Sequence, residues 1–185
     1  MNAPLATAMP VALMASLVLT GCSSSEYHED LTAGLNGSFE VVQEGLPVNW
    51  YFYTEDTAGG DFDIVVDTDI FIHGEQSVRF DVRDCSDEGG RHSPGLFQEF
   101  DAVPGETYTV SFLAKNDGTR FKAGVRGVDP KTGGPFESIT DRSDSFSNWQ
   151  RFEYRFEMPD HEKLRFEISV LEPGVLWVDN IRIEN

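Results

Sequence analysis

The chain of 185 residues carries 32 acidic side chains against 14 basic ones, which gives a formal net charge of −18 at pH 7. A surface this acidic repels nucleic acids and anionic lipid headgroups, so we exclude both as partners. The length is that of one domain behind a leader segment.

Residues 1–21 have the features of an export signal. The apolar run 11–19 is too short to cross a bilayer as a permanent helix, and it ends in small residues. The tetrad LTGC at 19–22 resembles the bacterial lipobox, although residues 1–9 contain no Lys or Arg. The resemblance implies that Cys22 is lipidated and begins the mature protein, anchored to a membrane by acyl chains alone. Because Ser23 is not the Asp of an inner-membrane retention signal, we expect the outer membrane, facing the periplasm or the outside.

The sequence contains two cysteines, Cys22 and Cys85, and a polar segment follows the first of them. With Cys22 lipidated, Cys85 is left without a disulfide partner, so stability must come from a core or a metal. Residues 22–34 are polar and without period, which predicts a lipidated Cys and a flexible tether. We expect one folded module over residues 35–185.

Apolar and polar residues alternate with a period of two through the rest of the chain. The clearest runs are 77–83, 107–115, 121–126, 152–157, 164–170 and 178–183, and turn signals such as PG at 104–105 and NDG at 116–118 separate them. No segment shows a sustained helical stripe, and the 14 Phe fall mostly on one phase of the strands. This pattern predicts an all-β fold, an antiparallel two-sheet β-sandwich.

Signatures of enzymes are scarce. The sequence contains no G-x-S-x-G, H-E-x-x-H, P-loop or C-x-x-C motif, and its four His have no metal-ligand spacing. We therefore predict a protein without catalytic activity. An enzyme would need two carboxylates, or a Tyr–His pair, that converge in a cleft.

Polar side chains on the non-core phase of several strands are candidates for sugar binding. Lys115, Arg126 and Glu167 lie on this phase of their strands, and Gln98 has the same character on an earlier strand. If these strands are neighbours, one sheet face carries amide, guanidinium and carboxylate groups. An ordinary solvated face remains the alternative.

The segment 50–53 (WYFY) is the densest aromatic cluster, and sugars stack on exposed aromatic rings. In an alternating strand, either Tyr51 and Tyr53 or Trp50 and Phe52 face away from the core. The sequence leaves both phases open, so Trp50, Tyr51 and Tyr53 are all candidates. Phe136, beside a Gly-Gly-Pro turn, is a further candidate at the rim.

A series of short motifs resembles one family of proteins. In chain order these are NGSFE at 36–40, LPVNW at 46–50, HGEQSVRF at 73–80, FQEF at 97–100, PGETYTVSF at 104–112, WQRF at 149–152 and LWVDNIRI at 176–183. The order resembles that of the jelly-roll carbohydrate-binding modules of families four, nine, sixteen and twenty-two, in the galactose-binding-like superfamily. Two positions depart from the family: the terminal acidic pair is Asp179 followed by Asn180, and Leu113 stands where many relatives carry an aromatic residue.

The resemblance implies a function and a cofactor. It implies non-catalytic binding of a polysaccharide or oligosaccharide, with Gln98 and Arg126 at polar binding positions. It also implies a structural Ca²⁺, held by the side chains of Glu40 and Asp179 and the carbonyl of Glu75, with water completing the shell. The alternative is a structural or protein-interaction module at the cell envelope whose sugar site has decayed, which the residue at 113 favours.

Overall fold

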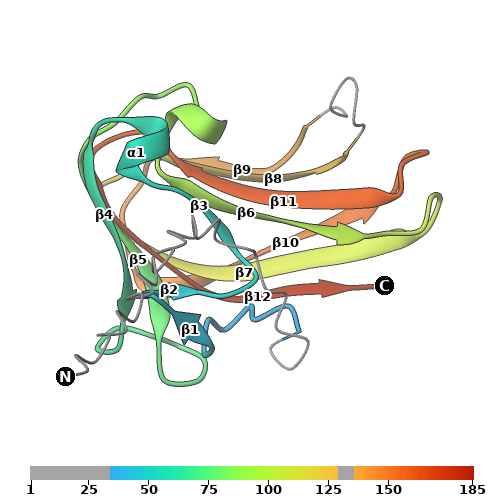
Figure 1. Cartoon of the computed structure of the whole chain (residues 1–185), viewed down its shortest axis with the longest axis horizontal. Coiled ribbons are helices and arrows are strands. Elements are labelled where there is room, and N and C mark those ends of the chain that lie inside the picture. Colours follow the sequence, from blue (N-terminus) through green and yellow to red (C-terminus); the bar gives the residue numbers. More distant parts are fainter. Residues whose placement is uncertain (1–33, 129–135) are drawn as a thin grey trace, which may run out of the picture.

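The protein is a sandwich of two antiparallel five-stranded sheets, as the computed structural model shows for residues 34–128 and 136–185 (Figure 1). Strands make up 58% of the described residues and helices 5%, so the all-β prediction is confirmed. Residues 1–33 lie outside the described residues, and they include the predicted signal, Cys22 and all of the predicted tether except Gly34. No helix in the described part is long and apolar enough to span a membrane.

The two sheets are named here by their strand order. Sheet 1 has the order β3 (Tyr51–Tyr53), β6 (Gly95–Asp101), β11 (Lys163–Val170), β8 (Phe121–Gly127) and β9 (Glu137–Arg142). Sheet 2 has the order β10 (Phe146–Glu157), β7 (Thr107–Asp117), β12 (Gly174–Glu184), β5 (Ser77–Asp84) and β4 (Asp61–Asp67). The connections contain a hairpin of β1 (Val42–Gln43) and β2 (Leu46–Pro47), the short helix α1 (Glu55–Ala58) and the 3₁₀ turn η1 (Gly90–His92).

Phenylalanines hold the two sheets together. The ring of Phe112 on β7 lies 5.7 Å from that of Phe166 on β11 and stacks on Phe152 of β10 at 5.0 Å. Phe112 and Phe166 are both fully buried. Because side chains alternate along a strand, burying one phase turns the other phase outward on each sheet. The outer faces of the two sheets therefore carry the polar residues available for binding.

The predicted strands match the observed ones except at their ends and at one sheet edge. The runs 77–83, 107–115, 121–126 and 164–170 all lie within observed strands, whereas β10 begins at Phe146, ahead of its predicted start. The edge strand β9 has no counterpart in the prediction. Its sequence, ESITDR, pairs with β8 on one side only, so it needs less apolar patterning than a central strand.

Asp67 organises the outer face of sheet 2. Its Oδ2 accepts the indole N–H of Trp177 at 2.9 Å and pairs with Nη1 of Arg79 at 3.0 Å, while Oδ1 accepts the N–H groups of Asp69 and Ile70. Burial alone would raise the pKa of Asp67, but these N–H groups and the Arg79 charge lower it below its ordinary value. Trp177, at 8% exposure, is consequently a packed residue of this sheet.

We predict that Asp67→Asn lowers the free energy of unfolding by about 1–3 kcal/mol at pH 7, because it removes charge-assisted hydrogen bonds. The depressed pKa means that the carboxylate stabilises the fold above the unfolded-state pKa of about 4 and loses this contribution as the pH falls further. The deficit should therefore shrink in urea titrations below pH 4. Asp63→Asn, at an exposed site on the same strand, serves as the control, and an equal deficit at pH 7 and pH 3 would contradict the assignment.

Candidate functional site

The outer face of sheet 1 brings together aromatic and charged side chains from four strands. The strand register arranges them in three rows: Tyr51, Phe97, Glu167 and Gly124; Glu99, Arg165 and Arg126; and Tyr53, Gly95, Ser169 and Lys122. The alternate residues of β11, among them Phe166 and Ile168, are fully buried in the core. These rows therefore form the outward phase of the sheet.

Arg165 is the centre of a polar network on this face. Its Nε donates to Oε2 of Glu167 at 3.0 Å, its Nη1 donates to Oε1 of Glu99 at 3.2 Å, and its Nη2 donates to the phenol oxygen of Tyr53. Nη2 of Arg126 lies 3.6 Å from the same Oε2 of Glu167. Burial raises the pKa of the Tyr53 phenol and the charge of Glu167 adds to the rise, so Tyr53 remains a neutral partner at ordinary pH.

Planar groups from three neighbouring strands stack in a column beside this network. The Tyr51 and Phe97 rings are 4.9 Å apart and inclined by 13°, and Cζ of Arg165 lies 3.7 Å from the centroid of Phe97. Tyr51 is 42% exposed, so the solvent end of the column is aromatic. Of the two phases left open by the sequence, the structure selects the one with Tyr51 and Tyr53 outward.

The position of Trp50 differs from the sequence prediction, which included this residue among the sugar-binding candidates. It is 4% exposed, and its indole N–H donates to the carbonyl of Asn36 at 3.0 Å. Its ring packs edge-on against Phe39 and Phe166. Trp50 is a core residue because its phase of the strand faces the other sheet.

A cavity of about 370 Å³ opens over β8 and β11 on the same face, and its lining includes Gly90, Lys122, Arg126, Phe136, Glu167 and Ser169. The Phe136 ring lies over Gly124, where a Cβ would overlap it, and Nζ of Lys122 is 4.7 Å from the ring centroid. The backbone N–H of Gly90 donates to Oγ of Ser169 at 3.0 Å and so fastens the 87–90 loop beside the cavity.

Glu167 presents its two oxygens to different surroundings. Oε2 takes the contacts from Arg165 and Arg126, whereas Oε1 lies 3.5 Å from the position that a Cβ on Gly90 would occupy. The residue is only 7% exposed, yet it lines the cavity. A carboxylate fixed in this way can accept hydrogen bonds from hydroxyl groups that enter the cavity.

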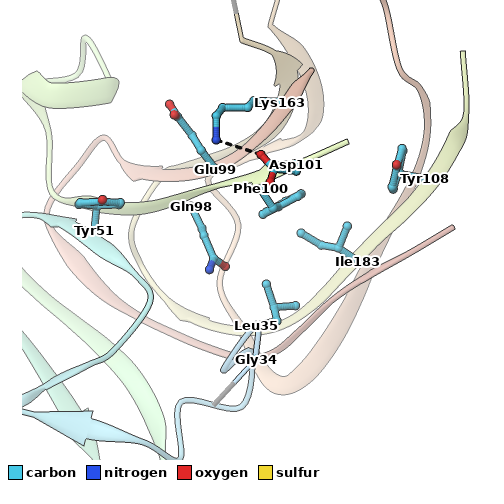
Figure 2. Close-up of a pocket in the computed structure, with 10 residues that line it drawn as sticks. All are labelled: Gly34, Leu35, Tyr51, Gln98, Glu99, Phe100, Asp101, Tyr108, Lys163 and Ile183. Carbon is cyan, nitrogen blue, oxygen red and sulfur yellow. Dashed lines mark hydrogen bonds and ion pairs between the residues drawn. The ribbon is translucent and has the colours of Figure 1, made fainter. Parts of the chain in front are cut away.

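Gln98 and Lys115 lie elsewhere, which corrects the expectation that they share one face with Arg126. Gln98 pairs with Phe166 on the inward phase of β6. Its side chain points toward Leu35, into a second cavity of about 550 Å³ at the edge of the sheet. The neighbouring Glu99 side chain points the opposite way (Figure 2). Lys115 belongs to β7 of sheet 2, where its Nζ lies 5.0 Å from the Trp177 ring. Period-2 alternation assigns a residue to one side of its strand, but it does not assign the strand to a sheet.

Sequence reasoning missed Phe97 and did not select Arg165 as a site residue, although alternation places Arg165 with Glu167 on the outward phase of its strand. Phe97 belongs to the outward phase as well, so alternation could have included it. Nothing in the sequence distinguished Arg165 from the other polar residues of that phase, because its importance comes from partners on β3 and β6.

The residues predicted to hold calcium meet at one loop but form a different arrangement. Oδ2 of the fully buried Asp179 accepts the N–H groups of Ile72 and His73 at 2.9 Å, and Glu40 accepts the N–H of Glu75 at 3.1 Å. The described residues contain no group of three or more His, Cys, Asp or Glu side chains that could hold a metal ion. Since these carboxylate oxygens face N–H donors, the set does not fit a calcium cage, and the calcium prediction rests on the resemblance alone.

The fold is shared with solved structures of carbohydrate-binding modules. The CBM22-1 xylan-binding domain from Paenibacillus barcinonensis Xyn10C is 15% identical, with a TM-score of 0.59 over 80% of this chain and 90% of that one. A structure described as "CBM4 structure and function" is 16% identical, with a TM-score of 0.57 over 80% of this chain and 97% of that one.

Two larger proteins contain a similar domain. The chain spans 26% of the CBM22-1–GH10 structure of Clostridium thermocellum xylanase 10B, at 17% identity over 74% of this chain and a TM-score of 0.57. It spans 20% of the enzymatically active domain of tailspike protein 4 of bacteriophage CBA120, at 18% identity over 80% of this chain and a TM-score of 0.58. No family model and no curated protein matches the sequence. At these identities the comparisons establish the jelly-roll fold.

We predict that removing divalent metal with a chelator leaves the melting temperature unchanged, because Glu40 and Asp179 bind backbone N–H groups directly. Asp179→Asn should lower the free energy of unfolding by about 1–3 kcal/mol, since its amide would place a donor against an N–H donor. Thermal melts with chelator and with added calcium measure both effects. A calcium-dependent rise in melting temperature that Glu40→Gln abolishes would instead establish the ion implied by the family resemblance.

Gln98 provides a second stability test. Its Oε1 is buried and accepts no hydrogen bond from any group in residues 34–128 and 136–185. We predict that Gln98→Met raises the free energy of unfolding by about 1 kcal/mol, because a buried unsatisfied carbonyl is costly. Urea unfolding measures the change, with Gln150→Met on β10 as the control. A loss of stability in the Gln98 variant would show that the amide has a partner in solution.

Proposed function

We propose that this protein is a non-catalytic carbohydrate-binding module that holds a polysaccharide or oligosaccharide on the outer face of sheet 1. The observation that carries the proposal is the geometry of Glu167, whose Oε2 is held by two guanidinium groups while Oε1 is left for a cavity with an aromatic wall. Sugars need planar hydrogen-bonding groups for their hydroxyls and aromatic faces for their C–H groups. This face offers both.

Arg126 is the donor that complements Glu167. Its side chain is 30% exposed, and its contact with Glu167 is long at 3.6 Å. The guanidinium fork therefore keeps N–H groups that can donate to a pair of neighbouring hydroxyls. Ser169 adds a hydroxyl on the floor of the cavity, and Phe136 forms the wall. Exposed Tyr51 extends the aromatic surface toward the sheet edge.

The carboxylates of this face support binding without hydrolysis. A glycosidase places two carboxyl groups on opposite sides of the scissile bond, one of them as a proton donor. Glu99 and Glu167 instead both accept hydrogen bonds from the single Arg165 between them. This arrangement fixes both of these groups as hydrogen-bond acceptors. The other carboxylates that line the cavity are those of Asp87, Glu88 and Asp141.

The competing function is a protein-interaction module with a decayed sugar site, which Leu113 favours in the sequence. Leu113 suggested a missing aromatic residue on the binding face. It lies on β7 of sheet 2, paired with Asp179 and Arg151, and takes no part in the face described here. The fold similarity to xylan-binding modules is a further argument for a polysaccharide ligand.

We also propose that the module is displayed on the cell envelope, anchored to the outer membrane through acyl chains on Cys22. The support is the sequence of residues 11–22 and the polar residues after it. Metabolic labelling with a radioactive fatty acid tests this anchor. The label should be incorporated into the wild type and be absent from Cys22→Ala.

We predict that the protein binds a restricted set of glycans on an array of plant, algal and bacterial polysaccharides. Arg126→Ala and Glu167→Gln should each weaken binding at least about tenfold, equivalent to about 1.4 kcal/mol, because each removes a charge-assisted hydrogen bond. Arg151→Ala on sheet 2 is the matched control and should bind as the wild type does. Absence of binding across the array would contradict the proposal, as would equal effects of Arg126→Ala and Arg151→Ala.

A further inference from the structure

We infer that Arg165 is the positioning residue of the binding face, holding Glu167 and the aromatic column in the geometry that the glycan meets. This inference rests on the proposed function. Arg165 itself is poorly placed to touch a ligand, because its side chain is only 14% exposed. It acts through the residues that it holds.

Each nitrogen of the Arg165 guanidinium has a separate task. Nε fixes Glu167 on the same strand, Nη1 fixes Glu99 on β6, and Nη2 reaches Tyr53 on β3. Its flat surface covers Phe97 at 3.7 Å. One side chain therefore connects three strands of sheet 1 and joins the carboxylates of this face to the aromatic column of Tyr51 and Phe97.

Only arginine can make this set of contacts. A lysine ammonium has three donors at one point and no flat surface, so it cannot satisfy partners in three directions while stacking on a ring. Without the guanidinium, Glu99 and Glu167 would be diagonal neighbours on adjacent strands with like charges and no cation between them. Glu167, which is 7% exposed, would keep only the 3.6 Å contact with Arg126. Its Oε1 would then no longer be held toward the cavity.

The protein contains a matched ion pair that lacks the positioning role. Arg151 and Glu153 on β10 have the same two-residue separation as Arg165 and Glu167, with Nη2–Oε2 at 2.8 Å. This pair is about half exposed, at 51% and 53% for the two side chains, and it lies on sheet 2. An exposed pair of this kind contributes little to stability. Arg151→Lys therefore controls for the loss of a guanidinium as such.

The test measures glycan affinity and melting temperature for Arg165→Lys, Arg151→Lys, Glu167→Gln and the double variant Arg165→Lys/Glu167→Gln. The probe is the glycan that binds the wild type most tightly on the array. We expect Arg165→Lys to weaken binding at least about tenfold and Arg151→Lys to leave it within about twofold. Because Arg165 acts through Glu167, the double variant should bind the glycan less than about threefold more weakly than Arg165→Lys does. Glu167→Gln as a single variant should weaken binding at least about tenfold.

A purely structural role would lower the melting temperature without this non-additivity in affinity. If Arg165→Lys fails to fold, Tyr53→Phe replaces it, since it deletes only the phenol oxygen that accepts from Arg165. That variant should still weaken binding severalfold. A wild type that binds no glycan would overturn the proposed function and this inference together. Two results would overturn the inference alone, provided that the wild type binds a glycan. One is an Arg165→Lys variant, or its substitute Tyr53→Phe, that binds as tightly as the wild type. The other is a double variant whose loss of affinity equals the sum of the two single losses.

Discussion

The contact between Phe112 on sheet 2 and Phe166 on sheet 1 fixes the side of each sheet that faces solvent. Both rings are fully buried, and side chains alternate along every strand, so a shift of one residue would move the whole apolar set outward. With Phe166 inward, Arg165 and Glu167 must lie on the outer face of β11. The proposed binding face therefore depends on the core that lies behind it.

The charged residues of the face are arranged by mutual pairing within a strongly acidic protein. Arg165 and Arg126 balance Glu99 and Glu167 at the centre of sheet 1, whereas the chain as a whole carries a net charge of −18. Paired charges of this kind present oriented hydrogen-bonding groups. This property suits an uncharged polyhydroxyl ligand, while the acidic remainder of the surface discourages polyanions.

The sequence predicted the fold and half of the face, and its failures have a common physical reason. The two-residue period identified the strands and the outward phase of Arg126 and Glu167. It does not show that β7 belongs to sheet 2, so that Lys115 lies away from the face on sheet 1. It also does not show that Gln98 occupies an inward position beside Phe166. The phase of residues 50–53 and the role of Arg165 depend on partners far along the chain, and no local pattern encodes those contacts.

The most direct test of the account is an NMR titration of the isotopically labelled protein with a soluble oligosaccharide of the glycan selected on the array. The account predicts that backbone and side-chain shifts change on β3, β8 and β11, around Tyr51, Arg126 and Glu167. The same titration should leave the outer face of sheet 2 unchanged, including the indole N–H of Trp177. Shifts that cluster around Trp177 and Lys115, with none near Glu167, would contradict the claim that sheet 1 carries the binding site.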